Sequence, residues 1–221
     1  MELKEIKNRI PKETYEALEK DGIKNLTPAQ NKAVKAGLLE GKSLLVCTPT
    51  ASGKTLIAEL IGTKNIVEGK GKTIYIVPLK ALASEKYRDF KNRYGHFLRV
   101  ALSIGDLDSS DPHLAKFDFI VCTAEKLDSL IRHHSPWLNY VKTVVVDEVH
   151  LMNDPSRGPT LEILITILKK LLKDVQIIAL SATIGNPGEL SEWLEAKLVE
   201  DKWRPVKLHK GIYFDGKIEF E

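Results

Sequence analysis

The chain has 221 residues, of which 43% are hydrophobic and 29% are charged. This length suffices for one large or two small domains, and the composition is that of an ordinary soluble globular protein. Because 33 basic residues stand against 30 acidic ones, the net charge is only +3, which excludes a polycation and restricts any nucleic-acid site to a local patch.

The first residues and the longest apolar runs bear on where the protein works. The opening MELKEIKNRI lacks the apolar segment of a signal peptide, and no run approaches the ~20 apolar residues of a membrane span. Both cysteines, Cys47 and Cys122, lie inside apolar runs, as buried thiols in a reducing compartment do. We therefore expect a cytoplasmic protein without a membrane partner.

The order of the predicted elements indicates the fold class. The first 40 residues have a helical pattern and contain no strand of their own. Near-continuous apolar runs follow, and each is predicted to be a strand: 43–48, 73–78, 99–104, 118–123, 143–147 and 176–182. Helical patterns lie between them, at 53–69, 79–95, 124–134 and 159–173. Strands that are apolar on both faces and alternate with helices predict an α/β fold with a mostly parallel sheet and helices on both faces.

In sheets of this kind, ligands bind beyond the carboxyl ends of the strands. The residues that directly follow the apolar runs are therefore the candidates for chemistry. The tail from Trp203 has a different character, because it is short, basic and strand-like and no helix follows it.

The segment TPTASGKT, residues 48–55, follows the first predicted strand and opens a helix. Small residues allow successive backbone N–H groups to point into one concavity, and the helix N-terminus adds partial positive charge. In this pattern Lys54 reaches the β- and γ-phosphates of a nucleotide, and the Thr55 hydroxyl ligates Mg²⁺. Thr48 stands where the usual pattern has glycine, so a structural glycine turn is the alternative.

Asp147 and Glu148 lie at the carboxyl end of the predicted strand at 143–147. Two adjacent carboxylates at the end of a buried strand are costly unless a cation needs them. We expect Asp147 to hold Mg²⁺, directly or through water, and Glu148 to orient and deprotonate the attacking water. A solvated Asp–Glu turn is the alternative.

Two other segments carry polar side chains at the ends of elements. Ser181 and Thr183 place hydroxyl groups at the end of the strand at 176–182, where a γ-phosphate or the pair Asp147 and His150 could be sensed. A capped strand end is the alternative. Pro28 starts a helix and Gln30 lies just inside it. The Gln30 amide offers a donor and an acceptor that suit the adenine edge, with a solvent-facing glutamine as the alternative.

Six segments in a fixed order resemble the first RecA-like domain of superfamily-two DExH helicases: TPAQ (27–30), TPTASGKT (48–55), PLKALA (78–83), TAEK (123–126), DEVH (147–150) and SAT (181–183). DEVH and the HLMNDPSRGPTLE that overlaps it resemble the Ski-like branch. WRPVKLHKGIYFDG near the end resembles the archaeal Hjm-type DNA helicases. The resemblance runs from about residue 10 to the end of the sequence and implies a RecA-like P-loop domain.

The resemblance implies roles around ATP and Mg²⁺, the two expected cofactors. The catalytic set would be Lys54, Asp147, Glu148 and His150, with Thr55 and Asp147 at the metal. His150 would couple the site to Ser181, Ala182 and Thr183. The nucleotide would be bound by Gln30, which would read adenine, and by Thr48, Pro49, Thr50, Ala51, Ser52, Gly53, Lys54 and Thr55.

The resemblance also implies a nucleic-acid track along the loops after alternate strands. Lys80 and Lys126 would supply charge and Thr123 a hydroxyl, so the contacts would read the backbone rather than the bases. The implied contact residues are Pro78, Leu79, Lys80, Gly105, Asp106, Thr123, Ala124, Glu125 and Lys126.

The resemblance finally implies how the chain is organised. Residues 1–202 would be the first RecA-like ATP-binding domain, and residues 203–221 a linker and the start of a second one that is absent. The chain has no Gly-Arg-x-Gly-Arg-like stretch, whereas a translocating helicase takes an arginine finger from its second domain. This fragment alone should therefore bind nucleotide weakly and hydrolyse it slowly or not at all.

The implied whole enzyme is an ATP-dependent DNA helicase of 3′–5′ direction that acts on forked or branched DNA in repair and recombination. Its partners would be single-stranded or forked DNA, the second RecA-like domain and further C-terminal domains of the same enzyme. Three alternatives are a Ski-like RNA helicase, a non-motor P-loop ATP switch, and a nucleic-acid docking module without ATP function.

Overall fold

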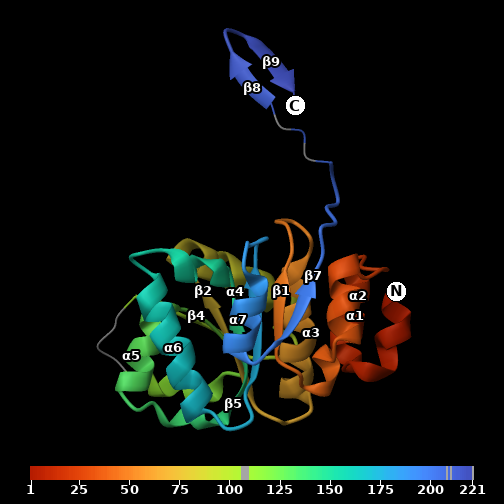
Figure 1. Ribbon diagram of the computed structural model, residues 1–221. Helices are drawn as coiled ribbons and strands as arrows, with labels where there is room; N and C mark the ends of the chain where they lie inside the picture. The colour runs from red at the N-terminus through yellow and green to blue at the C-terminus, as the bar shows by residue number, and fades with distance from the viewer. Residues whose placement is uncertain (106–109, 208, 210, 221) are drawn as a thin grey trace.

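The computed structural model describes residues 1–105, 110–207, 209 and 211–220 (Figure 1). Its α-helices are α1 (Lys12–Lys20), α2 (Pro28–Lys35), α3 (Lys54–Val67), α4 (Lys80–Tyr94), α5 (Ala124–Arg132), α6 (Gly158–Leu171) and α7 (Pro187–Leu194). Its strands are β1 (Leu44–Cys47), β2 (Lys72–Val77), β3 (Val100–Ser103), β4 (Phe119–Thr123), β5 (Val141–Val146), β6 (Gln176–Ser181), β7 (Lys197–Glu200), β8 (Gly211–Phe214) and β9 (Lys217–Phe220). Short 3₁₀ helices lie at Leu3–Arg9, Leu38–Glu40, Pro112–Lys116, Pro136–Tyr140 and Val149–Asn153.

Seven strands form one parallel sheet in the order β3-β4-β2-β5-β6-β1-β7. The six predicted strands are all present, which confirms the predicted sheet. The sequence pattern does not predict β7, which pairs with β1 at one edge. Only Val199 of its four residues is buried, so this edge strand lacks the continuous apolar run that marks strands covered on both faces.

The sheet is covered by helices on both faces, as predicted (Figure 1). Side chains alternate along each strand, so Tyr75 and Val145 pack on one face under α3 and α4. Ile76 and Val146 pack on the other face, which α5, α6 and α7 cover. Burying each of these apolar side chains contributes about 1.5–3 kcal/mol, and this fixes the face on which the residue after each strand emerges.

The C-terminal tail forms a separate antiparallel pair, β8 and β9, which Figure 1 draws apart from the seven-stranded sheet. The strand-like character predicted for the tail is therefore confirmed at Gly211–Phe214 and Lys217–Phe220, whereas the described residues 203–207 and 209 form no strand. Ile212 and Phe214 expose 73% and 81% of their surfaces, so the hairpin has no core of its own. Its assignment to the start of a second domain stays a prediction.

The two cysteines are buried and free, as predicted. Burial raises the pKa of Cys47 to about 11 and that of Cys122 to about 12, so both remain thiols at neutral pH. Within the described ranges, none of the helices has the length and apolar character needed to cross a membrane.

Candidate nucleotide site and nucleic-acid interface

Three neighbouring strands, β5, β6 and β1, bring the predicted catalytic segments to one edge of the sheet. The strands are parallel, so their carboxyl ends point the same way. The Thr48 backbone N–H donates to the Ser181 carbonyl at 3.2 Å, which joins the end of β1 to the end of β6. The Asp147 N–H donates to Ile76 O of β2 at 2.9 Å. The acids and the 48–55 loop therefore emerge at the same end of the sheet, with β6 between their two strands, although almost a hundred residues separate them in the sequence.

Lys54 opens α3 and turns its ammonium group back under the loop. Its Nζ donates to the carbonyl oxygens of Thr48 at 3.1 Å and Ser181 at 3.0 Å, and only 9% of the residue is exposed. Both partners are neutral oxygens, so the buried positive charge is hydrogen-bonded but not neutralised by them. An anionic phosphate is the ligand that such a charge favours.

The loop itself needs unusual backbone angles. Ala51 and Gly53 have φ angles of 64° and 83°, in the left-handed region that alternates with ordinary angles in anion-binding turns. A side chain at Gly53 would also place its Cβ 2.5 Å from Gln30 Nε2. Thr48, which stands where glycine is usual, is fully buried, and its hydroxyl lies 2.7 Å from the Ser52 hydroxyl. Thr48 thus supports the loop by a side-chain hydrogen bond.

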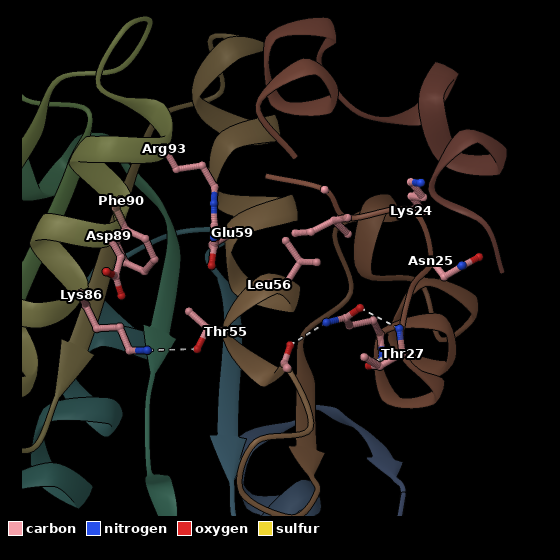
Figure 2. A pocket seen from close by; sticks show the side chains of 14 residues that line it. Lys24, Asn25, Thr27, Thr55, Leu56, Glu59, Lys86, Asp89, Phe90 and Arg93 are labelled. Carbon is pink, nitrogen blue, oxygen red and sulfur yellow. Dashed lines mark hydrogen bonds and ion pairs between the residues drawn. The ribbon is translucent and has the colours of Figure 1, made fainter. Parts of the chain in front are cut away.

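Gln30 and Thr27 connect α2 to the loop, and Thr27 is labelled in Figure 2. The Gln30 Oε1 accepts from Thr27 N at 2.8 Å, and its Nε2 donates to Gly53 O at 2.8 Å. The Thr27 hydroxyl donates to Ser52 O at 3.0 Å. Gln30 is 4% exposed, so it is not solvent-facing. Its amide keeps one hydrogen and one lone pair for a ligand, and its contact with adenine stays a prediction.

Asp147 is held at both carboxylate oxygens. The Tyr75 hydroxyl donates to Oδ2 at 2.7 Å, and the Glu148 N–H donates to Oδ1 at 3.0 Å. Glu148 has a φ of 52°, which turns the chain sharply away from the strand direction at a cost of the order of 1 kcal/mol. Strained non-glycine residues of this kind gather at functional sites, which supports a functional role for Glu148.

His150 connects the acids to the segment after β6. Its Nδ1 accepts the Ala182 N–H at 3.3 Å and lies 3.3 Å from Glu148 Oε2. Accepting that N–H places the proton of the neutral ring on Nε2. Ser181 is buried and Thr183 is exposed. The backbone of Ala182, rather than either hydroxyl, therefore makes the contact with His150.

A cavity of about 450 Å³ opens beside the loop, between the segment before α2 and the helices α3 and α4 (Figure 2). Thr55 lies in its wall and accepts a hydrogen bond from Lys86 Nζ at 3.2 Å. The sequence patterns assign roles to Gln30, Gly53 and Thr55 but not to the rest of the wall. The other residues come from the segment before α2 and from α3 and α4, and they show no motif spacing. The residues missed are Gly22, Ile23, Lys24, Asn25, Thr27, Leu56, Glu59, Lys86, Asp89, Phe90 and Arg93.

One wall of the cavity carries a buried ion pair. Glu59 Oε2 accepts hydrogen bonds from Arg93 Nη1 at 2.5 Å and from the Tyr94 hydroxyl at 2.5 Å. Arg93 also pairs with Asp21. Burial lowers the pKa of Arg93, but the two carboxylates raise it by more, so the net pKa is raised. The guanidinium charge is thereby satisfied inside the protein, and Lys86 is a cation on this wall that faces Thr55.

The donors at the edge fit magnesium better than a softer metal. Mg²⁺ prefers one or two carboxylates together with phosphate oxygens and water, and Thr55 and Asp147 supply a hydroxyl and a carboxylate. The Tyr75 hydroxyl lies near both. Burial and the charge of Asp147 raise the pKa of Tyr75 well above its usual range, and hydrogen bonding with Thr55 opposes that shift. Across the described part of the chain no cluster of three or more His, Cys, Asp or Glu residues could hold a metal alone.

The predicted nucleic-acid loops follow β2, β3 and β4, which lie next to one another in the sheet. Pro78 and Leu79 precede α4, and Lys80 opens that helix with an exposed side chain. Gly105 follows β3 with a φ of 98°. Asp106 lies outside the described residues.

The loop after β4 differs from expectation at its lysine. Thr123 accepts the Lys126 N–H at 3.4 Å and caps α5, which begins with Ala124 and Glu125. The Lys126 side chain is only 2% exposed and pairs with Asp111 at 2.9 Å. The expected surface charge of Lys126 is therefore not presented in this conformation, because Asp111 neutralises it. Its contact with nucleic acid stays a prediction.

A small cavity of about 20 Å³ joins the two groups of loops. Pro78 and Glu125 of the predicted track line it together with Asp147 and Glu148. Arg157, which directly precedes α6, lines it as well. The loops predicted to bind nucleic acid and the acids predicted to act on nucleotide thus share a wall.

The parallel sheet, with the 48–55 loop and the acids at the carboxyl ends of its strands, defines the class of protein. The chain has a RecA-like helicase fold of the P-loop type. The chain belongs to the DEAD/DEAH box helicase family, whose model matches residues 27–190. The chain is 52% identical over 212 residues to the ATP-dependent DNA helicase Hel308 of Pyrococcus abyssi, covering 96% of this chain and 29% of that protein. It is 57% identical over 214 residues to Hel308 of Methanocaldococcus jannaschii, covering 93% of this chain and 18% of that protein.

Solved structures show the same architecture. The helicase MrfA bound to DNA superposes with a TM-score of 0.76 at 29% identity, covering 88% of this chain and 30% of that one. MrfA bound to DNA and AMPPNP gives a TM-score of 0.74 at 28% identity, covering 87% of this chain and 29% of that one. The chain therefore spans less than a third of the length of these relatives.

Proposed function

We propose that this chain is the N-terminal ATP-binding domain of an ATP-dependent DNA helicase. The observation that carries the proposal is the shared edge: Lys54 bridges the ends of β1 and β6, and Asp147 emerges beside it from β5. The names of the relatives, ATP-dependent DNA helicase Hel308, specify the nucleotide and the nucleic acid.

The residues of the edge have complementary tasks in this proposal. Lys54 exchanges its two carbonyl partners for β- and γ-phosphate oxygens. Thr55 and Asp147 hold Mg²⁺, which when bound neutralises the charge that develops on the phosphates. Glu148 orients a water molecule and accepts its proton. Gln30, already bonded to the loop, presents its remaining amide hydrogen and lone pair to adenine.

His150 and Ala182 pass the state of the nucleotide to the segment after β6. Glu148 and Ala182 both lie at His150 Nδ1, so a movement of the acid on hydrolysis changes a contact that the backbone of Ala182 makes. Ser181, Ala182 and Thr183 thereby serve as coupling residues. We propose that a second RecA-like domain, of which residues 203–221 are the linker and first strand, closes on this edge and supplies an arginine finger.

On the nucleic-acid side, Lys80 and the N-terminus of α4 are suited to backbone phosphates. The solved relative MrfA carries DNA in its structure, which favours DNA over RNA as the track. A 3′–5′ direction and forked or branched substrates follow from the family resemblance. The small cavity that Pro78, Glu125 and Glu148 share offers a route by which hydrolysis alters the grip on the strand.

The test uses the full-length enzyme and matched DNA and RNA forks, with ATP hydrolysis and strand separation followed together. The proposal expects DNA-stimulated hydrolysis and unwinding of the DNA fork. Preferential unwinding of RNA would instead make it a Ski-like RNA helicase. Nucleotide binding without any nucleic-acid stimulation would make it a P-loop switch.

A further inference from the structure

A tyrosine outside every motif reaches the metal end of the site. Tyr75 lies in β2, and its hydroxyl donates to Asp147 Oδ2 at 2.7 Å. In the β2–β5 ladder Tyr75 pairs with Val145. Asp147 follows Val145 by two residues, so the alternation of strand residues places it on the same face as Tyr75. The contact is therefore fixed by the strand register.

The ring of Tyr75 cannot easily turn away. It is 0% exposed and packs edge-on against Phe90 at a centroid distance of 5.1 Å, with Phe119 at 6.5 Å. A phenylalanine would fill the same space among these aromatic neighbours. The hydroxyl must therefore be explained by its hydrogen bond, since a buried phenol without a partner destabilises a fold.

The hydrogen bond completes the support of one carboxylate. Oδ1 of Asp147 receives the Glu148 N–H and Oδ2 receives the Tyr75 hydroxyl. Donors at both oxygens fix the carboxylate plane while each oxygen retains a lone pair. Hydrogen bonds of this kind orient metal-binding groups in many proteins.

We propose that Tyr75 is a positioning residue that holds the Asp147 carboxylate in the orientation required for the Mg²⁺ that accompanies the nucleotide. The inference rests on the proposed metal role of Asp147. The Tyr75 hydroxyl also interacts with Thr55, which is the other residue that would bind the metal.

The experiment is a Mg²⁺ titration of fluorescent ATP binding to the 221-residue chain and its Tyr75→Phe variant. Loss of an outer hydrogen-bond partner typically costs about 10- to 100-fold in metal affinity. We expect the half-saturating Mg²⁺ concentration of Tyr75→Phe to rise by that factor. Binding of the nucleotide in EDTA should stay within about twofold of wild type, because Lys54 and the loop are unchanged.

Tyr94→Phe is the matched control. Tyr94 is also fully buried and donates its hydroxyl to a buried carboxylate, that of Glu59. A purely structural role for Tyr75 predicts that both variants lower the melting temperature similarly and leave the Mg²⁺ requirement unchanged. That outcome would overturn the inference, as would an equal rise of the Mg²⁺ requirement in both variants.

An Asp147→Asn variant separates this inference from the assignment on which it rests. If Asp147→Asn raises the Mg²⁺ requirement and Tyr75→Phe does not, Tyr75 is not a positioning residue. If Asp147→Asn binds Mg²⁺ and ATP like wild type, the metal role of Asp147 is wrong. Should Tyr75→Phe fail to fold, Asp147→Glu tests the same geometry, because the longer side chain shifts the carboxylate away from the Tyr75 hydroxyl. An unchanged Mg²⁺ requirement in Asp147→Glu would then contradict the inference.

Discussion

Two groups of loops at the carboxyl ends of the strands differ in how many contacts their predicted residues already make. We call the segments after β5, β6 and β1 the nucleotide edge, and the loops after β2, β3 and β4 the nucleic-acid edge. At the ends of β5, β6 and β1, hydrogen bonds join the predicted residues Lys54 to Ser181 and His150 to Ala182. Tyr75 of β2, which no motif includes, also donates to Asp147. At the ends of β2 and β4, the Lys80 side chain is exposed to solvent and the Lys126 side chain is buried against Asp111.

In the proposed function, the difference reflects the size of the ligand that each group of loops would bind. A triphosphate is small, and a loop with a buried ammonium group can be built for it in advance. A nucleic-acid backbone is long and is contacted by single charges on several loops. The nucleotide edge should therefore respond sharply to single substitutions, whereas the nucleic-acid edge should respond weakly and additively.

The largest expected effect is at Lys54. Lys54→Ala removes two charge-assisted hydrogen bonds to phosphate, each worth roughly 1.5–3 kcal/mol, so ATP affinity should fall by at least about 100-fold. Lys64→Ala is the control, because Lys64 lies on the same helix and pairs with Glu68 instead. Fluorescence anisotropy of labelled ATP measures both variants. Equal affinities would remove Lys54 from the site.

Glu148→Gln should separate binding from hydrolysis. The amide keeps the size of the side chain but cannot accept the proton of water, and general-base catalysis contributes about 10²–10⁴-fold. In the full-length enzyme we expect ATP binding near wild type and a DNA-stimulated rate lower by that factor. Glu162→Gln, an exposed change on α6, should have no effect. Normal turnover by Glu148→Gln would refute its assignment as the base.

Substitutions of the two lysines of the nucleic-acid edge should have opposite effects. Replacing Lys126 should lower stability, and replacing Lys80 should weaken DNA binding. Lys126→Met removes the ion pair between Lys126 and Asp111, so it should lower the free energy of unfolding by about 2–3 kcal/mol. This is less than the ~3–5 kcal/mol of a fully buried pair, because the Asp111 side chain is 16% exposed. Lys80→Ala should change stability by less than about 0.5 kcal/mol.

DNA-binding measurements should also distinguish the Lys80→Ala variant from the Lys126→Met variant. Lys80→Ala should reduce the slope of log affinity against log salt by about 1, and Lys126→Met should leave that slope unchanged. Urea unfolding and DNA binding at several salt concentrations provide the two readouts. A reduced slope in Lys126→Met would show that its ammonium group leaves Asp111 and contacts the strand.

The smallest effect concerns the thiols, one near each edge. Burial raises the pKa of Cys47 to about 11 and of Cys122 to about 12. The raised pKa values mean that the folded state favours the neutral thiols. The stability that the two thiols contribute is therefore fully present below the pKa of an unfolded cysteine, near 8.5. It is lost as pH rises through about 11 for Cys47 first and about 12 for Cys122 second. Disulfide-exchange labelling should be slow at pH 8 and should reach Cys47 first as pH rises. Rapid labelling of Cys122 at pH 8 would contradict its burial.

Most of the fold is predictable because its strands are apolar on both faces, and the motif residues follow those strands directly. The strand β7 is not, because only Val199 of its four residues is buried. The phosphate loop and the acids carry local signals in their spacing. Tyr75 and Lys86 carry none, because their roles arise from strand register and from the packing of α4. The ion pair between Lys126 and Asp111 cannot be predicted from the sequence either, because Asp111 lies fifteen residues earlier in the chain.

The central claim is that the 48–55 loop and the acids of β5 meet around one magnesium-bound triphosphate. A crystal structure of the chain with a non-hydrolysable ATP analogue and Mg²⁺ tests it most directly. We predict one metal ion between Thr55 Oγ1 and the Asp147 carboxylate, reached directly or through water, with Lys54 Nζ moved from its carbonyl partners to the phosphates. A nucleotide bound elsewhere, or a metal that contacts neither Thr55 nor Asp147, would contradict the account.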